Sequence, residues 1–111
     1  MAKGVAKNSS RILGITKRQL QAKFKHAADF GVQGNWSNAA GNKFNSVINQ
    51  HINSKGVKDI NGTHRGNNVM HYVNPKTRLN VISTPSGNVI SGWKLNSSQL
   101  KMLLIVEVYE N

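Results

Sequence analysis

The 111-residue sequence contains no cysteine and few acidic residues. Without cysteine the protein can form no disulfide, no cysteine metal site and no cysteine nucleophile. Only four Asp and Glu stand against 15 Lys and Arg, and the acids outside the last five residues are Asp29 and Asp59. Enzymes that use two metal ions need several converging carboxylates, so the sequence gives little support to such chemistry.

Long apolar runs are also missing. No stretch reaches the roughly 18 residues of a membrane-spanning helix, and the first ten residues, MAKGVAKNSS, lack the apolar segment of a signal peptide. We therefore expect no membrane span, and we expect any export to be directed from outside this chain. Residues 1–14 are small, polar and basic, which predicts a flexible arm or linker before a single domain over 15–111.

Positive charge is what the sequence has in excess. The net charge is +11 at pH 7, and residues 1–58 hold ten basic residues and one acid, whereas residues 59–111 hold five basic and three acidic. Such a field favours a polyanionic partner, because phosphate contacts that release counterions supply most of the non-specific affinity for nucleic acid. The alternative is a charge that only keeps the protein soluble.

The first half of the chain predicts two helices. Thr16 and Gln19 have capping-box spacing, and the apolar residues after them recur on one face of a helix over residues 17–28. After a glycine-containing connection, a clearer apolar stripe predicts a second helix over 39–53. This stripe includes His51, which we interpret as a core histidine.

From about residue 57 the pattern changes to short alternating segments between turn residues, which predicts antiparallel strands. The expected strands are 57–64, 68–73, 79–84 and 89–95. The tail is interpreted as a helix from Ser98, although residues 103–109 also suit a fifth strand. The result is an α+β fold: two N-terminal helices pack on one face of a twisted antiparallel sheet of four or five strands, and the other face is open.

The histidines suggest a way to cut RNA without a metal. They show no paired spacing of the kind that zinc sites use, and they are His26, His51, His64 and His71. RNA carries its own nucleophile, because its 2′-hydroxyl can attack the neighbouring phosphate and leave a 2′,3′-cyclic phosphate. The protein then needs only histidine for proton transfer and lysine for charge stabilisation.

His26 is the first candidate for that proton transfer. On a regular helix it projects away from the apolar face, and Lys23 shares its side at i, i+3. Lys25 would point elsewhere unless the helix is irregular. The alternative is a solvated basic helix face on which the histidine has no role.

A second candidate motif lies in the last expected strand. Alternation puts Ser91 and Trp93 on one face, roughly 7 Å apart, where tryptophan can stack on an unpaired base and serine can bind a phosphate. A core tryptophan is an equally good interpretation. Trp36, in a connection rich in glycine and asparagine, is interpreted as structural.

Other polar residues of the expected sheet are candidates for RNA binding. His64 and His71 either contact RNA or supply a second proton carrier, although structural roles are favoured for both. We also assign RNA contacts to Lys94, Arg65 and Lys76, which lie at the ends of the expected strands.

Two separated segments resemble one known family. KFKHAADFG at residues 23–31 and SGWKL at residues 91–95 together resemble the nuclease domain of the colicin D family, and HYVNPKT at residues 71–77 adds to the likeness. The resemblance extends over residues 14–100. It implies a microbial-RNase-like fold and a metal-independent endonuclease of the tRNA anticodon loop, found in colicins and at the C-terminus of contact-dependent growth inhibition toxins.

The resemblance also implies roles for single residues. His26 would be the principal acid/base catalyst, Lys23 and Lys25 would bind and stabilise the phosphate, and Ser91 and Trp93 would complete the site. No cofactor is implied.

The implied partners are tRNA and a cognate, often acidic immunity protein that binds a monomeric toxin domain. The domain would be delivered as part of a larger secreted or cell-surface toxin and act in the cytoplasm of the target bacterium. Two alternatives stay open: a non-catalytic RNA- or DNA-binding module, and a metal-dependent DNA nuclease, which the shortage of acids disfavours.

Overall fold

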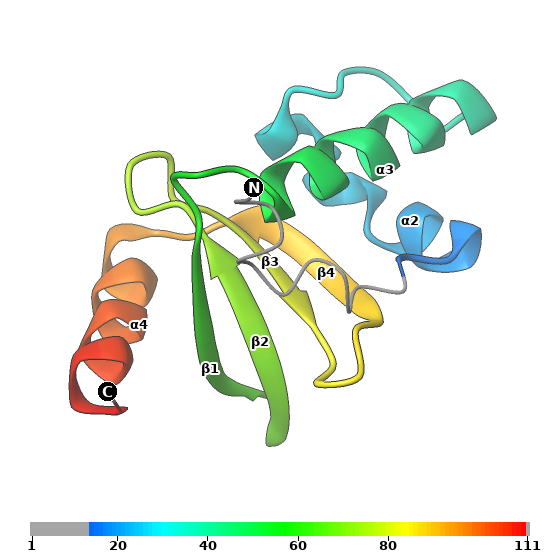
Figure 1. Ribbon diagram of the computed structural model, residues 1–111. Coiled ribbons are helices and arrows are strands. Elements are labelled where there is room, and N and C mark those ends of the chain that lie inside the picture. The colour runs from blue at the N-terminus through cyan, green and yellow to red at the C-terminus, as the bar shows by residue number, and fades with distance from the viewer. Residues whose placement is uncertain (1–13, 111) are drawn as a thin grey trace.

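The structure, a computed structural model, describes residues 14–110. The elements are α2 (Lys17–Ala22), the 3₁₀ helix η2 (Phe24–Phe30), α3 (Asn38–Ile52), β1 (Lys58–His64), β2 (Asn67–Val73), β3 (Leu79–Ser83), β4 (Val89–Lys94) and α4 (Ser97–Glu110). The strands form one antiparallel sheet in the order β1-β2-β3-β4 (Figure 1). The predicted α+β fold with a four-stranded sheet is therefore confirmed.

The predicted arm over residues 1–14 falls almost entirely outside the described residues. Its last residue, Gly14, is described, and it pairs with Asn88 in an isolated parallel bridge. The carbonyl of Gly14 accepts a hydrogen bond of 2.9 Å from the backbone N–H of Val89. Gly14 is thus in contact with the sheet. No helix in the described part of the chain is long and apolar enough to cross a membrane.

The predicted first helix over 17–28 is wrong in its second half. Thr16 caps α2 as expected, since its Oγ1 accepts a hydrogen bond of 3.1 Å from the N–H of Gln19. The α-helix ends at Ala22, and a 3₁₀ segment follows. A 3₁₀ helix has three residues per turn, so side chains three apart share one ridge. The ridge of Phe24, Ala27 and Phe30 packs into the hydrophobic core, whereas on a regular α-helix these three side chains would spread over about 120°.

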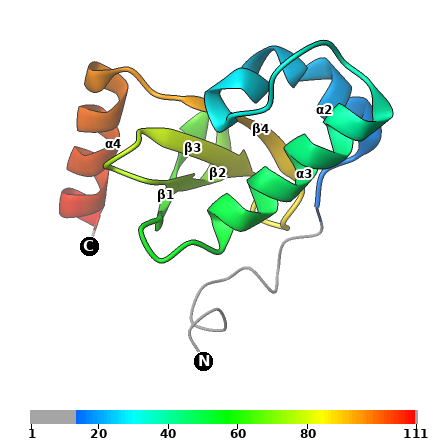
Figure 2. The same ribbon diagram turned by 90° about the horizontal axis from the view of Figure 1, so that it is seen from above.

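α3 covers one face of the sheet, together with α2 and η2 (Figure 2). Phe44, Ile48 and Ile52 of α3 are almost completely buried. His51 is buried as well, and its Nε2 lies 2.7 Å from the carbonyl oxygen of Tyr72. The interpretation of His51 as a core histidine is confirmed. Complete burial of large apolar side chains makes this face the main source of stability.

Trp36 belongs to the same core. Its ring meets the ring of Phe24 edge-on at a centroid distance of 5.4 Å. It also covers Gly41 so closely that a Cβ there would lie 2.6 Å from Trp36 Cη2. The structural interpretation of Trp36 is confirmed.

The sheet has two faces, which we name by the helix that lies on each. Tyr72 and Val81 point to the α3 face and join its core. Ile60 and Val73 point to the opposite, α4 face, where they pack with Leu103 of α4. The expectation of an open second face is therefore corrected, because α4 covers part of it (Figures 1 and 2).

The C-terminal tail is a helix because its first turn is capped. Asn96 Oδ1 accepts a hydrogen bond of 2.8 Å from the N–H of Gln99, and Gln99 Oε1 accepts one of 2.9 Å from the N–H of Asn96. This reciprocal pair is a capping box, and it satisfies two N–H groups that a helix start leaves free. The interpretation as a helix is confirmed, one residue earlier than expected, and the tail adds no fifth strand.

Candidate active site

The 3₁₀ segment also determines where its polar side chains lie. The period of three that buries one ridge puts Lys23, His26 and Asp29 on a second ridge. Lys25 lies on the third ridge and is exposed, whereas His26 is half-buried. The structure therefore groups His26 with Lys23, as the sequence predicted, and does so by a local geometry that the sequence analysis missed.

The second motif meets this segment at the edge of the sheet. Gly92 lies under Phe30 and Val81, and a Cβ at Gly92 would lie 3.1 Å from Phe30 Cζ. Asp29 Oδ2 accepts a hydrogen bond of 3.0 Å from the backbone N–H of Lys94. The glycine allows η2 to approach β4, and the carboxylate holds it there. Neither role was predicted from the sequence.

This packing brings His26 beside Trp93. The ring centroids are 6.4 Å apart, with the planes tilted by 44°. Trp93 points to the α4 face and is half-buried, so part of its ring is open to solvent. His26 and Trp93, which lie 67 residues apart in the sequence, thus belong to one cluster.

His64 is the third ring of this cluster, and its position depends on the twist of the sheet. Its ring centroid lies 5.7 Å from that of Trp93. The register places Trp93 in one row with Asn80, Val73 and Lys58, so His64 is six residues further along β1. In a flat sheet these six residues would separate the two rings by about 20 Å along the strand. The sheet is therefore not flat, and β1 and β2 cross the direction of β3 and β4 (Figure 1).

The surroundings of His26 favour its neutral form. Partial burial lowers the pKa of His26 below its ordinary value, and the charge of Lys25 lowers it further. Asp29 acts in the opposite direction, and Lys23 again lowers the pKa. A histidine that is neutral at neutral pH has a ring nitrogen free to accept a proton.

The surroundings of His64 also favour its neutral form. Burial lowers the pKa of His64, and the charges of Arg65 and Lys23 lower it further. The charge of Lys23 thus lowers the pKa of both histidines. Two histidines and a lysine around an aromatic ring are groups that transfer protons and stabilise negative charge.

His71 lies deeper on the same face and is fixed by its neighbours. It is 8% exposed, and its Nδ1 lies 3.2 Å from Asn80 Nδ2. The ring rests on Gly62, where a Cβ would lie 2.9 Å from His71 Cδ2. Burial lowers the pKa of His71, the hydrogen bond with the Asn80 side chain raises it, and the charge of His64 lowers it. Gly62 and Asn80 were not candidates in the sequence, because their roles depend on register.

The other predicted site residues lie at different depths and distances. Ser91 shares the α4 face with Trp93, as alternation predicted, but it is only 4% exposed. Arg65 is exposed in the turn after His64, and Lys94 is exposed beside Asp29. Lys76 is exposed in the turn between β2 and β3, where its N–H donates to Asn74 Oδ1. Their contacts with RNA stay predictions.

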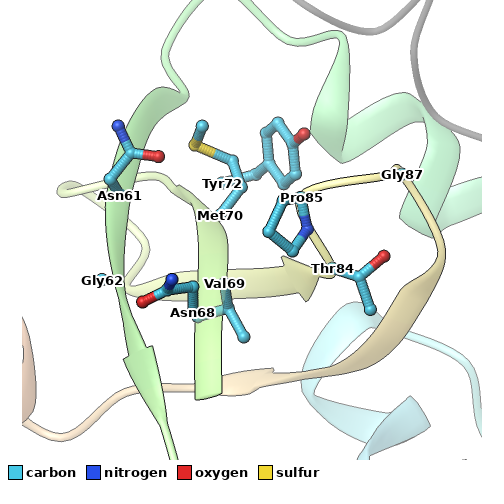
Figure 3. Close-up of a pocket in the computed structure, with 9 residues that line it drawn as sticks. All are labelled: Asn61, Gly62, Asn68, Val69, Met70, Tyr72, Thr84, Pro85 and Gly87. Atoms are coloured by element: carbon cyan, nitrogen blue, oxygen red, sulfur yellow. The ribbon is translucent and has the colours of Figure 1, made fainter.

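Two hollows flank the sheet, and only the smaller one lies at these groups. A hollow of about 270 Å³ opens between the sheet and α4, with His64, His71 and Trp93 in its wall. A larger hollow of about 410 Å³ lies on the α3 face, where Met70 and Tyr72 line it (Figure 3). No side chain in the wall of the larger hollow titrates near neutral pH. Of these two hollows, the one on the α4 face is therefore the one with side chains that can transfer protons near neutral pH.

The described residues include no group of three or more His, Asp or Glu side chains arranged to hold a metal ion.

The chain is similar to known proteins. The sequence profile of the Colicin D family matches residues 19–103, a range that includes η2 and β4. Colicin-D of Escherichia coli is 38% identical over 83 residues, which are 74% of this chain and 12% of colicin-D. The chain thus spans about an eighth of the length of that relative.

A solved structure is also similar. It is a ribonuclease from Escherichia coli complexed with its inhibitor protein, with a TM-score of 0.68 and 32% sequence identity. The match covers 79% of this chain and 97% of that one. From the profile, the sequence identity and the shared fold together, we conclude that the chain belongs to the Colicin D family of nuclease domains.

Proposed function

We propose that this domain is an endoribonuclease that cuts tRNA in the anticodon loop without a metal ion, leaving a 2′,3′-cyclic phosphate and a 5′-hydroxyl. The observation that supports this most directly is the cluster of His26, His64 and Trp93 beside Lys23. The net charge of +11 supports a nucleic-acid substrate. The similarity to a ribonuclease supports RNA as that substrate.

His26 is the proposed general base. Its neutral ring nitrogen takes the proton of the 2′-hydroxyl, and the 2′-oxygen forms a bond to phosphorus. Negative charge develops on the phosphoryl oxygens in the transition state. Lys23, on the same ridge of η2, and Lys25, whose charge acts on His26, stabilise that charge.

The leaving 5′-oxygen needs a proton as its bond to phosphorus breaks. His64 in its protonated form is the proposed donor, because its ring, like that of His26, lies beside Trp93. The lowered pKa of His64 makes the protonated form the minor one at neutral pH, and it also makes that form a stronger acid. One histidine then ends protonated and the other neutral, so the pair balances the proton of the reaction. A donor and an acceptor of this kind each contribute about 10²- to 10⁴-fold to a rate.

The remaining predicted residues bind and position the RNA. The open part of the Trp93 ring stacks on an unpaired base, as in other single-strand binding sites. Ser91 is nearly buried, so we assign it the positioning of Trp93 and the phosphate rather than proton transfer. Arg65 and Lys94 on the rim bind phosphates, and His71 and Lys76 are further RNA contacts.

The proposed partner besides tRNA is an acidic immunity protein. An inhibitor that covers the α4 face would meet the basic side chains around His26, and opposite charges favour fast association. The solved relative is itself bound to its inhibitor protein. We further propose that the domain is delivered as part of a larger secreted or cell-surface toxin and acts in the cytoplasm of the target bacterium.

The function is tested by incubating the pure domain with total tRNA in excess EDTA and sequencing the fragment ends. The proposal predicts discrete cuts in anticodon loops, with cyclic phosphate at the new 3′ ends. Binding without fragments would support the non-catalytic RNA-binding alternative. Cleavage of DNA that stops in EDTA would support a metal-dependent DNA nuclease instead.

A further inference from the structure

The hollow between α4 and the sheet has the composition of a nucleobase site. Its strand wall contains Trp93 and His71, and its helix wall contains Gln99, Met102 and Leu103. Met102 is 64% exposed, so its side chain is accessible to a ligand in the hollow. Thioether side chains make favourable contacts with aromatic rings. Trp93 and Met102 can therefore hold a flat ring between them.

Polar groups at the wall suit the edge of a base. Gln99 Oε1 is already occupied by the N–H of Asn96, so its amide NH₂ remains to donate hydrogen bonds. His71 Nδ1 is already engaged by the side-chain amide of Asn80 at 3.2 Å, which holds the ring in the wall of the hollow. The amide NH₂ of Gln99 fits a base edge that presents carbonyl oxygens or ring nitrogens as acceptors.

Both walls of the hollow lie within residues 19–103, the range that the family profile matches, because Gln99, Met102 and Leu103 come before α4 leaves that range. The helix wall contains none of the proposed proton-transfer groups. Changes in side chains around a common reaction site can redirect substrate choice without altering the reaction.

We propose that the hollow between α4 and β4 binds the unpaired nucleobase next to the cleaved bond, stacked between Trp93 and Met102. This inference rests on the proposed function, since it assumes that RNA is cut at the neighbouring histidines. It makes α4 an element that selects which base is accepted at the cleaved bond.

The test compares Met102→Ala with Ile105→Ala, a matched change on the same helix. Both side chains are exposed, at 64% and 42%, but only Met102 lines the hollow. The substrates are RNA oligonucleotides that differ in a single base on either side of the cleaved bond. We expect the wild-type protein to cleave substrates with certain bases faster than the others. Met102→Ala should lose about tenfold in kcat/KM on those preferred substrates, so that the differences in kcat/KM between bases become smaller. Ile105→Ala should match the wild-type protein.

Unchanged base preference in Met102→Ala, or an equal loss in Ile105→Ala, would overturn the proposed base site. An equal loss on all four bases would overturn the claim that α4 selects the base, because stacking alone tolerates any base. If wild type cuts none of the oligonucleotides or tRNA, the ribonuclease function itself fails. The failure of the base site and the failure of the function are thus distinct results.

Discussion

The two faces of the sheet are built from the same four strands, yet they differ in what they bury. On the α3 face, large apolar side chains such as Phe44 and Ile48 are completely buried, and His51 bonds to a backbone carbonyl. On the α4 face, the apolar cluster is smaller, and the rings of His26, His64 and Trp93 remain partly open. Strand alternation thus allows one face to provide stability while the other holds groups that can act on a substrate.

The largest effect is expected from His64 on the α4 face. His64→Ala should lower kcat/KM on ordinary RNA by about 10²- to 10⁴-fold, because the leaving oxygen loses its proton donor. A substrate in which sulfur replaces the bridging 5′-oxygen should be cut at nearly the wild-type rate, since a thiolate leaves without protonation. His26→Ala should gain little from the same substrate, because it lacks the base.

An equal loss for His64→Ala on the oxygen and sulfur substrates would contradict the role of proton donor. It would assign His64 to binding or to structure instead. The comparison is made at a single pH near neutrality with both variants folded, as checked by circular dichroism.

The two tryptophans allow a direct comparison of the faces, with a smaller effect. Binding is measured with an RNA that is 2′-O-methylated at the cleaved position, so that it cannot be cut. Trp93→Ala should weaken this binding by about 1–3 kcal/mol, the usual contribution of one base stacked on an aromatic ring. Trp36→Ala should leave this binding unchanged but destabilise the fold by about 3 kcal/mol, because it opens a cavity over Gly41. Fluorescence titration and urea unfolding measure the two quantities. If Trp36→Ala weakened RNA binding and Trp93→Ala mainly destabilised the fold, the assignment of RNA binding to the α4 face would be wrong.

The smallest effect concerns pH and His71. Burial lowers the pKa of His71 in the folded protein below its value in the unfolded chain. As the pH falls, His71 is therefore protonated in the unfolded chain before it is protonated in the folded protein. The free energy of unfolding has its full value above about pH 6.5, and it decreases as the pH falls from there to the pKa of His71 in the folded protein. Urea unfolding at pH 7.5 and pH 5 should show a larger loss for wild type than for His71→Gln. A loss of the same size in both proteins would remove His71 as the cause.

Much of the fold follows from local patterns in the sequence. The alternation after residue 57 and the turn residues between strands predict the four-stranded meander, and the stripe over 39–53 predicts α3 to within one residue. These predictions depend on the spacing of apolar residues, which recur about every 3.6 residues in helices and every second residue in strands, and the two spacings are distinct in this sequence. The break after Ala22 was missed because the residues up to Ala28 also fit one face of an α-helix.

The site was only partly predictable. The family resemblance and the helical spacing identified His26 and Lys23, and alternation paired Ser91 with Trp93. The approach of His64 to Trp93 could not be predicted, because it depends on sheet twist accumulated over four strands. The roles of Gly92 and Asp29 were hidden for a similar reason: each is defined by a contact between segments more than 50 residues apart.

The most direct test of a catalytic α4 face is the His26→Ala variant on tRNA. We expect cleavage to fall by at least about 10²-fold, while the urea unfolding midpoint and the affinity for 2′-O-methylated RNA stay close to wild type, because His26 is half-buried and makes no contribution to the α3 core. Cleavage by His26→Ala at the wild-type rate would contradict the assignment of the reaction to this face.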